Sequence, residues 1–399
     1  MPRLYFDHNA TSPLRPEARA ELERGLDADL GNPSSVHASG RRARMVIDEA
    51  RERVAAALGV AEGEVVFTGG GTEAIGLALR GAAARLEPGR AMATSAIEHA
   101  AVLETLRGLR DARGLELLEL GVDAAGSIDP DAVARACADA RVGLLSVAIA
   151  NNEIGVVQDL AALREALAER GAAPIVHTDA VQALGRIPID LAGWGADLAT
   201  FSAHKVGGPT GVGVLVARGG AIEPGADGGG QEMGFRAGTE NTAAIAAAAV
   251  AIELAVLEQP AYAARTRGLT EALWAGIHAE LPDARLLGPP IEDAARRLPN
   301  TANVLTDEGG DLLLARLDLE GVEASAGSAC ASGSIEPSHV LLALGLDEGG
   351  ARRGLRLSLG RTTEADAVEQ LVDIVCRTCR ALGEKRSTTG GSKRAGRMP

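Results

Sequence analysis

Between residues 60 and 220, short runs of consecutive apolar residues alternate with alanine-rich stretches of helical length. The clearest runs cover residues 65–68, 142–149, 174–179 and 211–216. They lack the alternation of apolar and polar residues that marks a strand with one wet face, so both of their faces must be buried. A mainly parallel sheet between layers of helices meets that requirement. We therefore expect an α/β fold, with ligands gathering at the carboxyl ends of its strands.

The length of the chain indicates more than one hydrophobic core. With 399 residues, it exceeds what one small core supports. We expect residues 15–258 to form a large domain around the sheet, and residues 1–14 together with 259–383 to form a smaller α/β domain. The segment 384–399 is basic and rich in Ser, Thr and Gly, which predicts a disordered tail.

Charge and composition argue against several function classes. A formal net charge of −14 disfavours direct nucleic-acid binding, which needs a basic surface. No apolar run is long enough for a membrane span, and the N-terminus lacks the apolar core of a signal peptide; both favour a cytoplasmic protein. Four cysteines are too few for a disulfide framework in a chain of this length. Cys376 and Cys379 form an isolated C-x-x-C pair in a helical pattern, so no metal site is predicted.

Lys205 closely follows the apolar run 196–201 and precedes a glycine-rich turn. Partial desolvation at the mouth of a buried strand favours the neutral amine, which is a nucleophile. Such an amine can form a Schiff base with pyridoxal phosphate, and the neighbouring Ser202 and His204 could hold the phosphate. A lysine after a strand is more often only a surface charge, so this interpretation depends on residues elsewhere in the chain.

Three further strand ends carry polar residues or glycines suited to such a cofactor. Asp179 could keep a pyridine nitrogen protonated, with a helix N-cap as the alternative. Gly71 and Thr72 open a helix after a strand, which suits phosphate binding, although an ordinary strand-to-helix turn is equally consistent. His99 could stack on the ring or relay protons, although a lone histidine is more often structural.

Cys330 lies in a run of ten small residues, 325–334. This segment has no bulky apolar residue to pack with, so we expect an exposed, mobile loop. An exposed thiol on such a loop is a candidate nucleophile, because structural cysteines are normally buried.

Together these residues resemble the NifS/IscS-like cysteine desulfurases, which are pyridoxal-phosphate enzymes of the aminotransferase class V superfamily. The resemblance extends from Tyr5 to about Arg361, with the motifs in the family's order. They are Tyr-Phe-Asp-His-Asn-Ala-Thr at 5–11, Gly-Asn-Pro-Ser-Ser-Val-His at 31–37, Glu98-His99, Asn-Asn-Glu-Ile-Gly at 151–155, His-Thr-Asp-Ala-Val-Gln at 177–182, Ser-Ala-His-Lys at 202–205, Arg-Ala-Gly-Thr at 236–239 and Gly-Ser-Ala-Cys at 327–330. The chain departs from the family's pattern at Ala74, Ile75, Gly76, Ala203 and Thr210.

The resemblance implies the type I pyridoxal-phosphate transferase fold, with a seven-stranded sheet in the large domain and a smaller C-terminal domain. It implies Lys205 as the Schiff-base lysine, Asp179 at the pyridine nitrogen and His99 stacked on the ring. The other cofactor ligands would be Gly71, Thr72, Asn152, Gln182, Ser202, His204 and, from the second subunit of a homodimer, Thr239. Asn152 and Arg356 would bind the substrate carboxylate, and Cys330 would take the sulfur.

The implied function is conversion of L-cysteine to L-alanine. The sulfur would stay on Cys330 as a persulfide and pass to an acceptor protein for iron–sulfur cluster assembly or tRNA thiolation. Cys330 could contact an iron–sulfur cluster during that transfer. A selenocysteine lyase or a cysteine sulfinate desulfinase would use the same pocket and stays an alternative. An ordinary aminotransferase has no use for the cysteine segment, and a non-catalytic sulfur carrier has no use for Lys205, Asp179 and His99.

Overall fold

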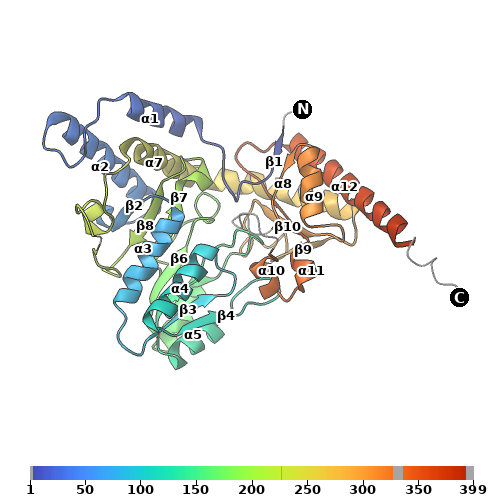
Figure 1. The fold of residues 1–399 in the computed structure, drawn as a ribbon, viewed down its shortest axis with the longest axis horizontal. Helices are drawn as coiled ribbons and strands as arrows, with labels where there is room; N and C mark the ends of the chain where they lie inside the picture. Colours follow the sequence, from blue (N-terminus) through green and yellow to red (C-terminus); the bar gives the residue numbers. More distant parts are fainter. Residues whose placement is uncertain (1–2, 226, 327–335, 392–399) are drawn as a thin grey trace.

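The computed structural model describes residues 3–225, 227–326 and 336–391. Figure 1 shows a larger body around a seven-stranded sheet, and a smaller body that contains the first strand and the C-terminal helices. Cys330 lies outside the described residues.

The seven-stranded sheet is mixed but mostly parallel, which confirms the predicted α/β class. Its strands, in spatial order, are β2 (Val65–Thr68), β8 (Gly213–Ala217), β7 (Leu198–Ser202), β6 (Ile175–Asp179), β5 (Val142–Ser146), β3 (Ala91–Ser95) and β4 (Leu117–Leu120). β8 is antiparallel to both of its neighbours, β2 and β7, whereas the remaining pairs are parallel. The carboxyl ends of β3, β5, β6 and β7 therefore point to the same side of the molecule.

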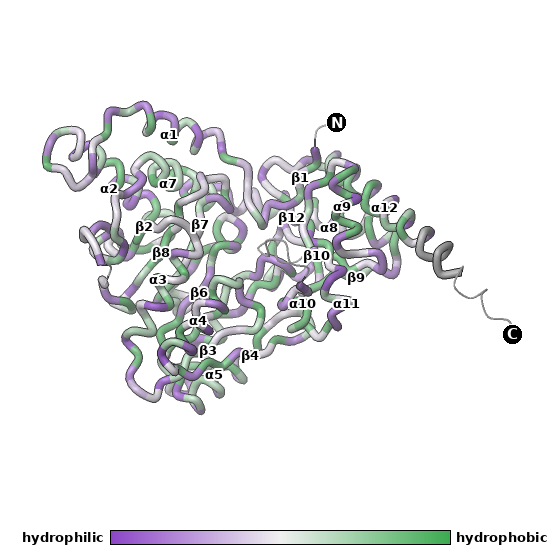
Figure 2. The backbone as a smooth tube through the Cα atoms, in the orientation of Figure 1, coloured by the Kyte–Doolittle hydropathy of each residue, from purple (hydrophilic) through white to green (hydrophobic). Residues whose placement is uncertain are grey.

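Helices cover both faces of this sheet. The described α-helices of the larger body are α1 (Pro16–Asp27), α2 (Ala38–Leu58), α3 (Gly71–Ala84), α4 (Ala100–Arg113), α5 (Pro130–Asp139), α6 (Leu160–Glu169) and α7 (Thr242–Leu257). α3 and α4 share one hydrophobic cluster with the sheet, and α2, α5, α6 and α7 share another. α1 packs against α7. Figure 2 shows hydrophilic and hydrophobic residues alternating along α1.

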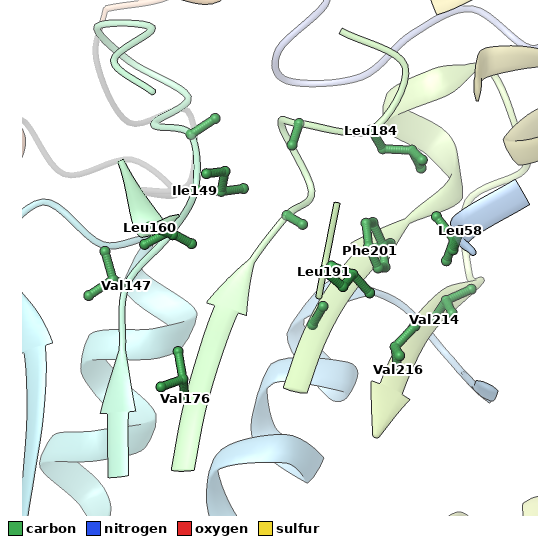
Figure 3. Packing of buried hydrophobic residues seen from close by; sticks show 14 of the residues in the cluster. Leu58, Val147, Ile149, Leu160, Val176, Leu184, Leu191, Phe201, Val214 and Val216 are labelled. Atoms are coloured by element: carbon green, nitrogen blue, oxygen red, sulfur yellow. The ribbon is translucent and has the colours of Figure 1, made fainter. Parts of the chain in front are cut away.

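Successive strand residues belong to different clusters, which explains the continuous apolar runs in the sequence. On β8, Leu215 packs on the α3–α4 side, whereas Val214 and Val216 pack on the opposite side. Figure 3 shows these two valines near Phe201 of β7 and Leu58 of α2. Burial of each such side chain stabilises the fold by roughly 1.5–3 kcal/mol. A polar residue on either face of the strand would therefore destabilise the fold.

The smaller body has its own core. Its sheets are the antiparallel set β12 (Gly354–Ser358), β10 (Thr301–Leu305) and β9 (Arg285–Leu287), and the parallel pair β1 (Leu4–Tyr5) with β11 (Val322–Glu323). Its α-helices are α8 (Gln259–Glu280), α9 (Asp311–Leu319), α10 (His339–Ala343), α11 (Glu348–Ala351) and α12 (Ala365–Gly391). Phe6, just after β1, is buried among residues of α8, α9 and α12, so the N-terminal segment is part of this body.

The last helix differs from the sequence prediction. α12 continues to Gly391, into the segment 384–399 for which a disordered tail is predicted. Glu384, Lys385 and Arg386 are good helix formers, which favours continuation of the helix into this segment. Residues 392–399 lie outside the described part of the chain.

α7 is the most apolar long helix of the fold. Within the described ranges, no single helix is long and apolar enough to cross a membrane, and α7 meets that test only together with α8, as a pair bent by 68°. Most residues of α7 are buried, and the helix packs against α1 and α2. The apolar residues of α7 therefore belong to the core of the larger body.

Candidate active site

Ten of the residues predicted for the site line one cavity of about 320 Å³. They are Gly71, Thr72, His99, Asn152, Asp179, Gln182, Ser202, His204, Lys205 and Arg356. Most of them follow the carboxyl ends of β3, β5, β6 and β7, whereas Arg356 comes from β12 of the smaller body. The cavity therefore lies between the two bodies, and it has the size of a small-molecule site.

Lys205 reaches the cavity from a short 3-10 turn, Ala203–Val206, that directly follows β7. Its Nζ donates hydrogen bonds to the carbonyl oxygens of Asn9, at 2.8 Å, and Ala10, at 2.7 Å. Ser12 Oγ donates to the carbonyl oxygen of Lys205 at 3.0 Å. The N-terminal segment therefore fixes both the backbone and the amine of this lysine.

Asp179 is the last residue of β6 and is only 8% exposed. Its Oδ1 accepts a hydrogen bond from the backbone N–H of Val181 at 2.9 Å. Burial raises the pKa of the carboxyl group, and the positive influence of His99 and Lys205 only partly offsets it. A buried carboxylate in this situation is stabilised by a further cation, such as a protonated pyridine ring.

His99 is the N-cap residue of α4. Its Nδ1 accepts a hydrogen bond from the backbone N–H of Ala101 at 3.1 Å. Because Nδ1 is the acceptor, the neutral imidazole carries its proton on Nε2. The start of the helix thus fixes the tautomer and the position of a ring that forms part of the cavity wall.

Gly71 is the first residue of α3, and its N-terminus adjoins the end of β7. A Cβ atom at Gly71 would come within 3.3 Å of the Ser202 Cβ, so glycine keeps this approach open. The helix N-terminus and the Ser202 hydroxyl form a suitable setting for a phosphate.

Burial lowers the pKa of His204 to about 4, assisted by the charges of Lys205 and Arg186. His204 is therefore neutral at pH 7, and its Nδ1 lies 3.0 Å from Thr11 Oγ1.

Arg356 is only 1% exposed. Its Nη2 donates to Asp7 Oδ1 at 2.7 Å, and its Nη1 lies 3.5 Å from the carbonyl oxygen of Asn152. The two residues predicted to bind the substrate carboxylate therefore lie side by side, although one comes from each body.

Two predicted residues are not part of this cavity as described. Thr239 is exposed and is absent from the residues that line it. Cys330 belongs to the segment 327–335, outside the described residues.

The structure also adds residues that sequence reasoning did not assign to the site. Asn9 and Ala10 line the cavity, although only their place in the N-terminal motif hinted at a role. Ile75 and Ile97 form apolar parts of the wall. Ile75 is one of the positions at which the chain departs from the family's polar pattern, so the wall is more apolar here.

Glu98 is buried directly before His99. Its Oε1 accepts hydrogen bonds from Ser95 Oγ at 2.7 Å and from the Ala148 backbone N–H at 2.8 Å. Burial is the main cause that raises the pKa of Glu98 from 4.5 to about 8. The folded protein therefore keeps this carboxyl group protonated at neutral pH, whereas the unfolded chain ionises it.

Replacing Glu98 with glutamine is expected to stabilise the fold at pH 8 and to have no such effect below about pH 4.5. The wild type loses stability as the pH rises from the unfolded pKa to the folded pKa, and the amide cannot ionise. Glutamine keeps the Oε1 acceptor for both hydrogen bonds. Unfolding free energies at several pH values measure the effect, with the exposed Glu116→Gln as control. A pH-independent difference would show that Glu98 is ionised in the fold.

The sequence of the chain matches the family model of class-V aminotransferases over residues 4–371. The chain belongs to the aminotransferase class-V family. It is 40% identical over 382 residues to the cysteine desulfurase IscS of Dictyoglomus turgidum, covering 95% of each chain. It is also 40% identical to the IscS-like cysteine desulfurase of Mycobacterium tuberculosis, over 94% of this chain and 97% of the relative.

Solved structures agree with this family membership. A NifS-like protein superposes with a TM-score of 0.86 at 33% identity, covering 94% of this chain and 98% of the other. A NifS-like protein from Rickettsia africae gives a TM-score of 0.82 at 30% identity, with 94% and 99% coverage.

This class-V family member is an enzyme that depends on pyridoxal phosphate. Its cavity fits that cofactor. Gln182 donates from Nε2 to the carbonyl oxygen of Asn9 at 3.1 Å, but its Oε1 is buried with no partner among the described residues. Such an oxygen costs free energy until a donor reaches it. With the buried Asp179 carboxylate and the glycine-lined start of α3, the cavity offers contacts for a hydroxyl group, a ring nitrogen and a phosphate.

Proposed function

We propose that this family member is a cysteine desulfurase, which converts L-cysteine to L-alanine and holds the sulfur on Cys330 as a persulfide. One observation carries the proposal: Lys205, Asp179, His99 and Arg356, from four separate segments, line a single cavity. The relatives named as cysteine desulfurases, which match nearly the whole chain, support it.

The ten predicted residues that line the cavity each have a role in this proposal. Bound pyridoxal phosphate supplies an electron sink for the pair left on the substrate Cα. Asp179 would hold the proton of the pyridine nitrogen, and His99 would stack on the ring. Gln182 would bond the ring hydroxyl. The phosphate ligands would be Gly71, Thr72, Ser202 and His204.

The substrate is oriented by its carboxylate and loses its Cα proton to Lys205. Arg356 offers a planar pair of N–H donors, which suits a carboxylate, and Asn152 lies beside it. Lys205 would hold the cofactor through its amine. When that amine is free and neutral, it would act as a general base at Cα, because the neutral form accepts a proton.

The sulfur transfer requires a thiolate. The Cys330 thiolate attacks the substrate sulfur, an S–S bond forms as the Cβ–S bond breaks, and the electron pair stays on Cβ, which takes up a proton. Lys205 then returns a proton to Cα. The products are L-alanine and a Cys330 persulfide. Atoms and electrons balance without an added oxidant or reductant.

The other three cysteines are poor candidates for this role. Cys137, Cys376 and Cys379 are buried. Burial raises the pKa of Cys137 and of Cys376 to about 11 and also raises that of Cys379. Neutral thiols are weak nucleophiles, so these three cannot readily take sulfur at neutral pH, which supports Cys330.

We further propose a cytoplasmic homodimer in which Thr239 contributes to the partner's phosphate site. The exposure of Thr239 on this chain is consistent with such a contact. The persulfide sulfur would pass to an acceptor protein for iron–sulfur cluster assembly or tRNA thiolation. Residues 15–258, and 1–14 with 259–383, are proposed as the two domains.

Borohydride reduction of the purified holoenzyme is expected to fix the cofactor permanently on Lys205. The reason is that Lys205 lines the cavity, and two backbone carbonyl oxygens hold its Nζ in place through hydrogen bonds. Peptide mapping by mass spectrometry identifies the modified lysine. Label on any other lysine would contradict the assignment, and Lys205→Ala should abolish the label and the yellow colour together.

A further inference from the structure

Asp7 connects the predicted carboxylate-binding arginine to the segment that precedes residue 327. One carboxylate oxygen, Oδ1, accepts from Arg356 Nη2 at 2.7 Å. The other, Oδ2, accepts from Ser325 Oγ at 2.8 Å. Both contacts join residues more than 300 positions apart in the sequence.

The backbone holds all three residues in place. Arg356 N–H donates to the Ser325 carbonyl oxygen at 2.7 Å, and Ser325 N–H donates back to Arg356 at 3.4 Å. On the other side, Ser358 N–H donates to the carbonyl oxygen of Phe6 at 2.8 Å, and Asp7 forms a parallel bridge with Ser358. Asp7 is thus a fixed part of the frame around β12, unlike a flexible surface acid.

The guanidinium of Arg356 needs such a partner. It is 1% exposed, and a buried cation is destabilising unless it is paired. Asp7 occupies Nη2, while Nη1 faces Asn152. A carboxylate ligand is bound well only when the plane of the guanidinium is already oriented. Arg356 lines the cavity, whereas Asp7 is absent from the described residues that line it. Asp7 therefore contacts Arg356 without forming part of the cavity wall.

We propose that Asp7 is a positioning residue that holds the Arg356 guanidinium in the orientation required to bind the α-carboxylate of an amino-acid substrate. The inference rests on the proposed function, in which Arg356 binds that carboxylate. Asp7 itself does not touch the substrate. It sets the affinity for α-carboxylate ligands, and through Ser325 it links this orientation to the backbone of the smaller body.

The test measures binding of L-alanine to the holoenzyme by calorimetry, alongside KM and kcat with L-cysteine. Asp7→Ala is expected to weaken L-alanine binding and raise KM about tenfold or more, which corresponds to about 1.4 kcal/mol, with a smaller change in kcat. Asp7→Asn keeps an Oδ1 acceptor for Arg356 and is expected to recover much of the affinity. Ser325→Ala, which keeps the charged pair, should give a smaller loss of the same kind.

Asp318→Ala is the matched control. Asp318 pairs with Arg3 at the exposed edge of β1 and α9, so its loss removes an ion pair of the same body without touching Arg356. L-alanine binding should be unchanged in this variant. If Asp7→Ala does not fold, Ser325→Ala decides, and wild-type affinity in that variant would overturn the proposal.

A double-mutant cycle separates the positioning role from the proposed function. Arg356→Ala should weaken binding most, and adding Asp7→Ala to it should cause no further loss, because Asp7 acts only through Arg356. Additive losses would overturn the positioning role. Wild-type affinity in Arg356→Ala would instead remove Arg356 from carboxylate binding and with it that part of the proposed function. A loss in Arg356→Ala with none in Asp7→Ala refutes the Asp7 inference alone.

Discussion

Replacing Asp179 with asparagine is expected to reduce alanine production from L-cysteine by about 100-fold or more, or about 2.7 kcal/mol of activation free energy. The amide cannot hold a proton on the pyridine nitrogen by charge, so the electron sink weakens. The fold should survive, because asparagine keeps the acceptor for the Val181 N–H. Alanine is measured by amine derivatisation, and the cofactor content by absorbance.

The cofactor-free variant gives a second, opposite readout. Burial raises the pKa of Asp179 in the fold, so its charge destabilises the cofactor-free protein at neutral pH. Asp179→Asn without cofactor should therefore melt at the wild-type temperature or above it. Asp197→Asn is the control, because Asp197 also accepts from a backbone N–H, that of Val176 at 2.8 Å, but lies at the opposite end of the parallel strands. Wild-type turnover in Asp179→Asn would show that another group protonates the ring.

The buried strands could be predicted because burial on both faces leaves a visible pattern. The runs 142–149 and 174–179 contain β5 and β6. The direction of β8 could not be predicted in the same way. A strand with two buried faces has the same composition whether it runs parallel or antiparallel, and the antiparallel placement of β8 depends on contacts with β2 and β7.

The site was predictable only where chemistry and position coincide in the sequence. Lys205 and Asp179 each follow an apolar run and stand at strand ends. Gly71 and Thr72 needed the family resemblance, because an ordinary turn gives the same pattern. The hydrogen-bond acceptors of the Lys205 amine could not be predicted from the sequence. They are backbone carbonyls of residues about 196 positions away, and a backbone carbonyl leaves no signature in side-chain type.

The pairing of Arg356 with Asp7 was hidden for a related reason. It depends on how β1, β11 and β12 come together in the smaller body, with Asp7 bridged to Ser358 and Arg356 bridged to Ser325. Such short strands carry little periodicity, so their register cannot be read from the sequence. The positions of isolated charged residues in this body therefore required the structure.

Replacing Cys330 with serine is expected to nearly abolish alanine production from L-cysteine while L-cysteine still binds. The cavity residues are unchanged, so the absorption spectrum of the cofactor should still respond to the substrate. A serine hydroxyl is not ionised at neutral pH and is a poor sulfur acceptor, so no persulfide forms. Alanine is measured by derivatisation, and the persulfide by intact mass after a single addition of L-cysteine.

The control and the competing substrates make this result decisive between the proposed function and its alternative. Cys137→Ala removes a thiol that is 1% exposed and whose pKa burial raises to about 11, so persulfide formation should persist in it. A lyase for selenocysteine or a desulfinase for cysteine sulfinate releases its product without a protein thiol, so the Cys330 variant should keep activity on those substrates if the pocket accepts them. Full alanine production from L-cysteine by Cys330→Ser would remove Cys330 as the nucleophile. The desulfurase proposal would then give way to the lyase, in which a thiolate from solution takes the sulfur, the electron pair of the Cβ–S bond stays on carbon, and carbon takes up a proton.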